Sequence, residues 1–310
     1  MVGGRVTQGT ITRQLLSNIN GNLRTMQSLQ EKMSTGRNIN RPSDDPVGIT
    51  YSLRYRSDLV VNERYQKNVT SALSSLDYND TMLSQVTDIL KRMKELAVQG
   101  SNGTNPDVAL DNIASEISQL KEQLVEISNS QFNGKYVFNG QFTDQKPYPE
   151  GTDPSSVVTD PGDLDYLISA GTQITVNLKG NEVFGYPPPG STTTSPVYEE
   201  DNIFYVADQL IANLQAGNHG GVGEQIALLE SRTDKVLTQQ AEVGARVNRV
   251  ELMEQRLTDL NLNLETLQSK TEDADLADLI IKAQVNENIY QASLSVGAKI
   301  VQPTLVDFLN

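Results

Sequence analysis

Apolar residues recur at helical spacing in both halves of the chain and lose that spacing in the middle. Near the N-terminus, steps of three and four residues, with one polar interruption, link Leu16, Ile19, Leu23, Met26 and Met33. This spacing places the side chains on one face of an α-helix. Gly36 is expected to end the helix, because glycine readily takes a positive φ at a helix C-terminus. The segment is therefore predicted to be one amphipathic helix.

A second helix is predicted to begin at Pro46, because the missing N–H of proline has no helical partner at the first position. Asp45 is the expected N-cap, and Asp44 adds negative charge near the positive end of the helix dipole. Apolar residues recur at every seventh position of this helix: Val69, Leu76, Leu83, Leu90 and Ala97. The helix is expected to end at residues 100–103, and a third helix with an unbroken apolar seam follows at 110–127.

Residues 132–201 lack the helical pattern. Two Asn-Gly turn dipeptides flank residues 135–138, whose composition is typical of a strand. Eight of the twelve prolines lie within 147–196, and proline interrupts long helices. Residues 175–178 and 183–184 are also predicted to be short strands. The pattern therefore predicts a small, loop-rich insertion with β structure.

The helical pattern returns at 203–214 and breaks at the glycine-rich loop 217–221. A long helix follows, with apolar residues at every seventh position: Leu229, Val236, Val243, Val250, Leu257 and Leu264. A final helix carries the apolar residues Leu279, Ala283, Ile289, Val296 and Ile300, and is expected to end at Pro303. The second half of the chain thus mirrors the order of helices in the first half.

This order predicts a mainly α fold: an elongated, antiparallel helical bundle with paired N- and C-terminal helices and a small β-rich insertion domain. Charge supports the pairing, because residues 1–41 hold six Lys/Arg and one Glu, whereas residues 251–310 hold ten Asp/Glu and four Lys/Arg. The predicted segments are an N-terminal coiled coil at 1–42, the two bundle halves at 43–140 and 202–272, the outer insertion at 141–201 and a C-terminal coiled coil at 273–310.

Composition argues against several classes of function. The 310 residues carry a formal net charge of −14, which disfavours nucleic-acid binding. The chain has no cysteine, and so no disulfides, thiolate metal ligands or cysteine nucleophiles. Its single histidine, His219, lies in a glycine-rich loop without apolar neighbours. We therefore predict neither a metal site nor a cofactor. The sequence also contains no run typical of a membrane span or a secretory signal.

Each acidic cluster could be a catalytic or metal-binding site, but each also has a simpler structural explanation. Asp44 and Asp45 could form a carboxylate pair, although a helix cap explains both. The aspartates within 160–165 have part of a calcium-loop spacing without its distal glutamate. Residues 272–275 are expected to begin the last helix, where acids complement the dipole. We therefore predict no enzymatic activity. A carboxylate-based enzyme on a helical scaffold is the rival from another class.

Residues 33–46, with the sequence MSTGRNINRPSDDP, resemble the bacterial flagellin superfamily. Within this motif, the turn and helix cap comprise Arg41, Pro42, Ser43, Asp44, Asp45 and Pro46. This form is more similar to the hook-associated branch than to filament flagellin. Residues 135–140, 244–249 and 300–309 resemble the same branch, and the resemblance covers residues 5–142 and 203–310.

The resemblance implies a structural subunit of the bacterial flagellum that forms the hook–filament junction and serves motility, with filament flagellin as the alternative. The terminal helices would form an inner coiled-coil tube around the export channel, and the insertion would face outward. The implied assembly residues are Leu16, Ile19, Leu23, Met26, Met33, Leu279, Ala283, Ile289, Val296 and Ile300.

The implied partners are further copies of the chain, the other hook–filament junction protein, flagellin and an export chaperone. No nucleic acid and no membrane are expected among them. Proteins of this kind leave the cell through the flagellar type III export apparatus without a cleavable signal peptide. The implied location is therefore extracellular, in the flagellum.

Overall fold

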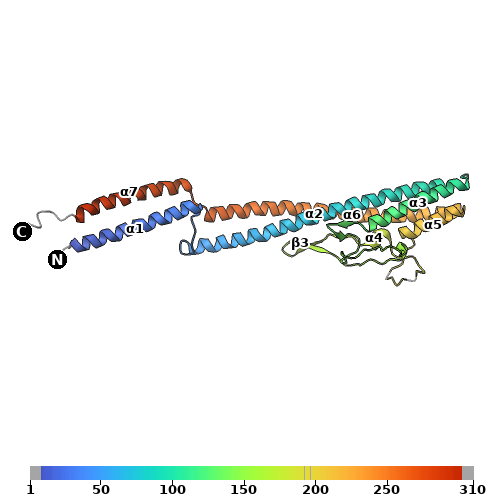
Figure 1. Ribbon diagram of the computed structural model, residues 1–310, viewed down its shortest axis with the longest axis horizontal. Helices are drawn as coiled ribbons and strands as arrows, with labels where there is room; N and C mark the ends of the chain where they lie inside the picture. The colour runs from blue at the N-terminus through green and yellow to red at the C-terminus, as the bar shows by residue number, and fades with distance from the viewer. Residues whose placement is uncertain (1–7, 192, 196, 302–310) are drawn as a thin grey trace, which may run out of the picture. The chain divides into compact units, whose positions relative to one another are not determined.

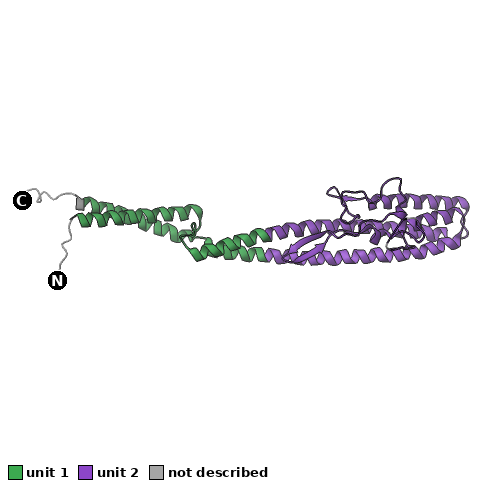
Figure 2. Cartoon of the chain, turned by 90° about the horizontal axis from the view of Figure 1, so that it is seen from below, with its two compact units in different colours: residues 1–61, 260–310 green, residues 62–259 purple. Residues whose placement is uncertain are grey.

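The computed structural model describes residues 8–191, 193–195 and 197–301. The chain divides into two compact units (Figures 1 and 2). Unit 1 comprises residues 1–61 and 260–310, and unit 2 comprises residues 62–259. The two long helices, α2 (Pro46–Gly100) and α6 (His219–Glu272), contribute residues to both units.

Unit 1 brings the two ends of the described chain together. Helices α1 (Gln8–Thr35) and α7 (Leu276–Val301) lie side by side and run antiparallel (Figures 1 and 2). Gly36 follows α1 with a φ of +69°, a conformation that costs glycine little because it has no Cβ. The predicted end of this helix and the predicted pairing of the terminal helices are therefore confirmed.

Unit 2 contains the main hydrophobic core. Helices α3 (Asp107–Ser128) and α5 (Ile203–Gln215) pack on each other. The seven-residue positions predicted on α2 are completely buried in one core cluster: Val69, Leu76, Leu83, Leu90 and Ala97. The equivalent positions of α6 belong to the same cluster: Leu229, Val236, Val243, Val250 and Leu257. The seven-residue pattern of both long helices thus marks core residues, as predicted.

The β-strands of the described residues form two antiparallel hairpins. Strands β1 (Gln131–Phe132) and β2 (Lys135–Tyr136) pair with Gln131 opposite Tyr136. Strands β3 (Asp165–Ser169) and β4 (Thr172–Thr175) pair with Asp165 opposite Thr175, and a short 3-10 helix, η1, covers Pro154–Ser156. The strand predicted at 135–138 is therefore two residues long. The one predicted at 175–178 shares only its first residue with β4.

Residues 183–184 correct a prediction, because they are helical and not extended. They end the short helix α4 (Gly180–Phe184), in which the side chain of Phe184 is completely buried. The ring centroid of Phe184 lies 5.0 Å from that of Phe138, 5.7 Å from that of Tyr148 and 5.6 Å from that of Phe204. A two-residue apolar run fits a strand or a buried helix equally well. The aromatic cluster decides between them.

An ionic cluster fixes the end of the insertion to α6. The guanidinium of Arg232, only 1% exposed, donates from Nη2 to Glu199 Oε2 and to Asp201 Oδ1, each at 2.6 Å. Lys235 pairs with the same two carboxylates. Burial raises the pKa of both carboxyls, but these cationic partners outweigh it and hold each pKa below its usual range. The insertion is therefore anchored by charges that are already paired.

Candidate assembly site

Helices α1 and α7 pack through a seam whose α7 side mixes apolar residues with an amide, a hydroxyl and a glycine. The least exposed α7 residues recur at steps of three and four: Leu279, Ala283, Asn286, Tyr290, Ser293 and Gly297. Asn22 on α1 donates from Nδ2 to Ser293 Oγ at 3.5 Å. A Cβ on Gly297 would lie 2.8 Å from Leu15 Cδ2 of α1. The absence of a side chain at Gly297 therefore leaves room for the Leu15 side chain of α1.

The predicted assembly residues divide between this seam and the surface. Those that are buried or half-buried are Ile19, Leu23 and Met26 on α1 with Leu279 and Ala283 on α7. Those that are exposed are Leu16, Met33, Ile289 and Val296. The side chain of Ile300 lies outside the part of the chain that the structure describes. The intramolecular pair thus uses part of the predicted set and leaves the rest in solvent.

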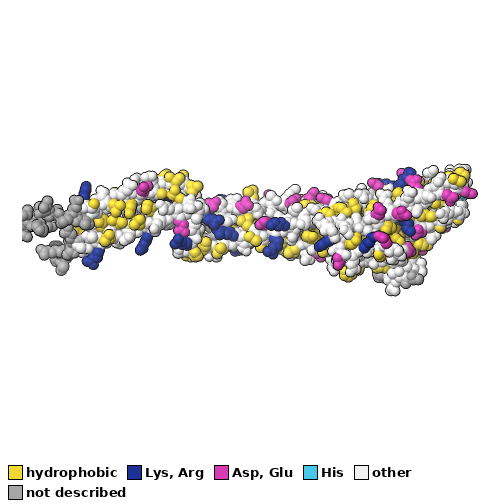
Figure 3. Space-filling view, in the orientation of Figure 1, with side chains coloured by type: hydrophobic (Ala, Val, Ile, Leu, Met, Phe, Trp, Pro, Cys, Tyr) yellow, Lys and Arg dark blue, Asp and Glu magenta, His cyan; other side chains and the backbone are white. Residues whose placement is uncertain are grey.

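A second face of α7 is more apolar than the seam and is exposed. We call it the outward stripe, and it comprises Ile281, Val285, Ile289, Ala292 and Val296. Its four larger side chains are between 47% and 63% exposed. At about 100° per residue, this stripe is centred about 120° around the helix from Leu279. Figure 3 shows hydrophobic side chains gathered over the terminal helices.

Sequence reasoning missed four seam residues of α7: Asn286, Tyr290, Ser293 and Gly297. Their spacing continues the steps of three and four from Leu279, so periodicity alone could have found them. Their residue types pointed elsewhere, because an amide, a hydroxyl and a glycine are uncommon in an apolar seam. Asn286 is only 7% exposed, and its Nδ2 has no hydrogen-bond partner among the described residues.

The cap of α2 is built by Asp45 and Pro46. Asp45 Oδ1 accepts a hydrogen bond from the N–H of Val47 at 3.0 Å, and the Asp45 carbonyl oxygen accepts one from the N–H of Ile49. Pro46 is the first helical residue, where its missing N–H is not needed. Asp45 therefore satisfies donors that a helix start would otherwise leave free.

Asp44 serves the turn before the helix. Its Oδ2 accepts from the N–H of Arg41 at 2.9 Å and from that of Asn40 at 3.1 Å, and these two bonds hold its pKa below the usual value. Arg41 Nη2 pairs with Glu31 Oε2 of α1 at 2.9 Å. Pro42 and Ser43 are exposed. The turn is thus held by its own backbone and by an ion pair to α1.

Glu272, the last residue of α6, joins the elements at the base of the terminal pair. Its side chain is 1% exposed. Oε1 accepts hydrogen bonds from Arg56 Nε at 2.8 Å and from Ser52 Oγ, and Oε2 pairs with Arg56 Nη2 and, at 3.5 Å, with Arg37 Nε. Burial raises the pKa of Glu272, but the bonds from Arg56 and Ser52 outweigh burial and keep the pKa lowered.

Backbone hydrogen bonds tie the two connecting segments together. The N–H of Asn38 donates to the Glu272 carbonyl oxygen at 2.6 Å, and the N–H of Ala274 donates to the Gly36 carbonyl oxygen at 3.0 Å. The start of α7 was predicted at 272–275, but only Asp275 serves it, accepting from the N–H groups of Ala277 and Asp278. The carboxylate of Glu272 instead binds Arg56 of α2. The local sequence does not reveal this contact, because Arg56 is distant along the chain.

The other candidate residues have separate structural partners. His219 Nδ1 lies 3.2 Å from the carbonyl oxygen of Gly100. Asp160 accepts backbone hydrogen bonds from Gln141 and Gly162, and Asp163 pairs with Lys179. Over the described ranges, no group of three His, Cys, Asp or Glu side chains could hold a metal ion. None of the helices there has a stretch both long and apolar enough to cross a membrane.

Comparison with known proteins gives similarity along most of the chain. Residues 6–143 match the family described as the bacterial flagellin N-terminal helical region. The flagellar hook-associated protein 3 of Salmonella typhimurium is 25% identical over 307 residues, which cover 93% of this chain and 94% of that protein. The flagellin of Bacillus subtilis is 27% identical over 304 residues, 96% of each chain.

Solved structures share the fold. The structure of a flagellar hook-associated protein from Vibrio parahaemolyticus superimposes with a TM-score of 0.65 at 19% identity, covering 74% of this chain and 100% of that one. Similarity at this level of identity concerns the fold alone. The mainly α, flagellin-like architecture expected from the sequence is therefore confirmed.

Proposed function

We propose that the chain, whose residues 6–143 are similar to the bacterial flagellin N-terminal helical region, is a structural subunit of the flagellum that forms the hook–filament junction. Both a hook-associated protein and a flagellin match most of its length. The form of the turn at 41–46 and the fold shared with hook-associated structures favour the junction over the filament. Filament flagellin remains the alternative.

The outward stripe of α7 carries this proposal. An aliphatic face left in solvent by the pairing of α1 and α7 is the surface that neighbouring copies of the terminal helices would cover. Complete burial of one Val or Ile side chain stabilises by about 1.5–3 kcal/mol. Because the four larger side chains of the stripe are about half exposed, covering them contributes at most about 3–6 kcal/mol per subunit. Packing between subunits therefore has a driving force that the single chain leaves unused.

Replacing the outward stripe tests this role. The double variant Ile289→Ser/Val296→Ser removes two exposed aliphatic side chains. We expect an unchanged melting temperature of the monomer together with loss of flagellar assembly and of swimming. Val108→Ser is the matched control, because Val108 is 71% exposed on α3. Normal swimming of the double variant would contradict the proposal.

Immunogold labelling of intact flagella separates the junction from the filament. A junction subunit gives a short labelled band immediately beyond the hook, whereas a filament subunit gives label along the whole length. The expected result is the short band. Label along the filament would replace the proposal by the flagellin alternative.

The finer assignments are also proposals. We infer that the segments 1–42 and 273–310 form an inner tube around the export channel, with 43–140 and 202–272 in the next layer and 141–201 outside. The partners are then the other junction protein on the hook side, flagellin on the filament side and an export chaperone that holds the C-terminal helix before export. The location is extracellular, reached by type III export, and the chain has no enzymatic role.

A further inference from the structure

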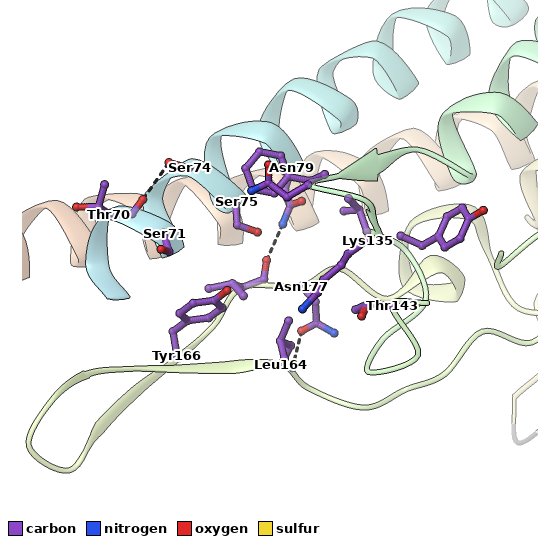
Figure 4. A pocket seen from close by; sticks show the side chains of 15 residues that line it. Thr70, Ser71, Ser74, Ser75, Asn79, Lys135, Thr143, Leu164, Tyr166 and Asn177 are labelled. Carbon is purple, nitrogen blue, oxygen red and sulfur yellow. Dashed lines mark hydrogen bonds between the residues drawn. The ribbon is translucent and has the colours of Figure 1, made fainter. Parts of the chain in front are cut away.

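A cavity of about 330 Å³ in unit 2 lies between α2 and the two β hairpins (Figure 4). Its helical wall carries hydroxyl and amide side chains, among them Ser71, Ser75 and Asn79 at successive turns of α2. The opposite walls carry Lys135 from β2 and Tyr166 from β3. Its volume is at the lower end of the range of about 300–1,000 Å³ that is typical of small-molecule sites. The cavity therefore fits a ligand of single-ring size.

Asn79 provides the observation that points to a ligand. Its side chain is 1% exposed and lines the cavity. Nδ2 donates to the Val176 carbonyl oxygen at 2.7 Å, but Oδ1 has no hydrogen-bond partner among the described residues. A buried acceptor without a donor costs about 1–3 kcal/mol. Neighbouring atoms cover Oδ1, so a ligand hydroxyl reaches it when the Asn79 side chain turns toward the cavity, and the bond then formed would remove that cost.

The remaining polar groups define what the ligand carries. Asn177, also in the wall, is already satisfied by the N–H of Leu164 and the carbonyl oxygen of Gly162. Within the described chain the side chains of Ser71, Ser75 and Lys135 make no hydrogen bond, so these groups are available to a ligand. Lys135 extends toward Asn177 in Figure 4. The wall thus offers hydroxyl groups, one unpaired acceptor and one ammonium group.

From this chemistry we propose that the cavity binds a sugar that carries a carboxylate, such as a uronic acid. The sugar hydroxyls would pair with Asn79 Oδ1 and the α2 serines, and the carboxylate would pair with the ammonium of Lys135. The ring of Tyr166 supplies an apolar face for the C–H side of a sugar ring, and in Figure 4 it rises from β3 toward α2. A nucleotide is disfavoured, because the cavity has one cation and no phosphate-binding glycine loop. This inference is independent of the assembly role.

The test is titration of the full-length monomer with glucuronic acid and glucose, followed by ligand-observed NMR and calorimetry. We expect weak binding of glucuronic acid, with a dissociation constant of about 1 mM for a ligand of this size, and weaker binding of glucose. Lys135→Ala should lower the affinity for glucuronic acid about fivefold to tenfold, as loss of one solvent-accessible charged hydrogen bond does. Lys135→Ala should leave the affinity for glucose unchanged. Lys91→Ala, at an exposed lysine of α2 outside the cavity, is the control.

A second variant tests the location. Ser75→Leu fills the cavity and should abolish binding, whereas Ser84→Leu, at an exposed position of the same helix outside the cavity, should not. Far-ultraviolet circular dichroism and melting curves verify that each variant is folded. Absence of binding to the folded wild type, or binding that persists in Ser75→Leu, overturns the site. Equal affinity for the two sugars overturns the role of Lys135.

Discussion

Replacement of Glu272 by glutamine tests how the terminal helices are held at their base. The substitution preserves the size of the side chain and removes its charge. In the native protein this carboxylate accepts hydrogen bonds from Arg56 and Ser52 and lies 3.5 Å from Arg37 Nε. A glutamine amide has its oxygen at only one of the two carboxylate positions, so its NH₂ group would face either Arg56 Nη2 or the pair Arg56 Nε and Ser52 Oγ, and at least one donor loses its acceptor.

The magnitude follows from the burial of the two partners. Hydrogen bonds to charged groups contribute about 1.5–3 kcal/mol each, and breaking a fully buried pair costs about 3–5 kcal/mol. Glu272 is 1% exposed, but the Arg56 side chain is 37% exposed and can be rehydrated. We therefore expect Glu272→Gln to lower the free energy of unfolding of unit 1 by about 1–3 kcal/mol.

Hydrogen exchange is the assay, because the effect is local to the connecting segments. Amide groups of residues 36–45 and 268–275 should exchange faster in Glu272→Gln, while those of the core helices of unit 2 keep their protection. Glu254→Gln, at an exposed position of α6, is the control. Unchanged exchange in both segments would refute the view that this carboxylate holds the two connections together.

The dependence on pH gives a second readout. Because the folded pKa of Glu272 is lowered, its contribution is fully present above its ordinary pKa of 4.5 and is lost as the pH falls through the lower folded value. The stability of the wild type should therefore fall more steeply than that of Glu272→Gln as the pH drops below 4.5. Parallel curves would show that the charge contributes nothing.

Three further predictions concern unit 1. Asp45→Ala should destabilise the start of α2 by about 0.5–2 kcal/mol, as loss of an N-cap does, measured by thermal melting of the monomer; no change in melting temperature would assign the residue to contacts between subunits. Gly48→Ala should also destabilise the protein, because the new Cβ would lie 2.6 Å from the buried Ile39 Cδ1. Gly21→Ala has open space around the new Cβ and should stabilise α1 by about 0.5–1 kcal/mol. Equal melting temperatures for the two variants would contradict this prediction. Limited proteolysis of dilute monomer should trim α1 and α7 before unit 2, since a single seam between two helices holds them; equal resistance of both units would show that the seam suffices.

The sequence alone determined the features that depend on local chemistry. The seven-residue spacing from Val69 to Ala97 predicted core positions, and all of them are buried. Gly36 and Pro46 marked the end of one helix and the beginning of the next, because their backbone preferences act on their immediate neighbours. A repeat over many helical turns, or a restricted backbone at one residue, can be recognised from the local sequence, because neither depends on segments distant in the chain.

Tertiary structure decided every choice between alternatives that the sequence left close in energy. Helix α7 offers two stripes at helical spacing, and packing against α1 covers the one with Ser293 and Gly297, where the Leu15 side chain fits, so that the aliphatic stripe stays outside. Phe184 is helical because rings distant in the sequence surround it. Glu272 pairs with Arg56, 216 positions away. Such contacts depend on which surfaces meet after folding, and a pattern read along one segment contains no information about its partner.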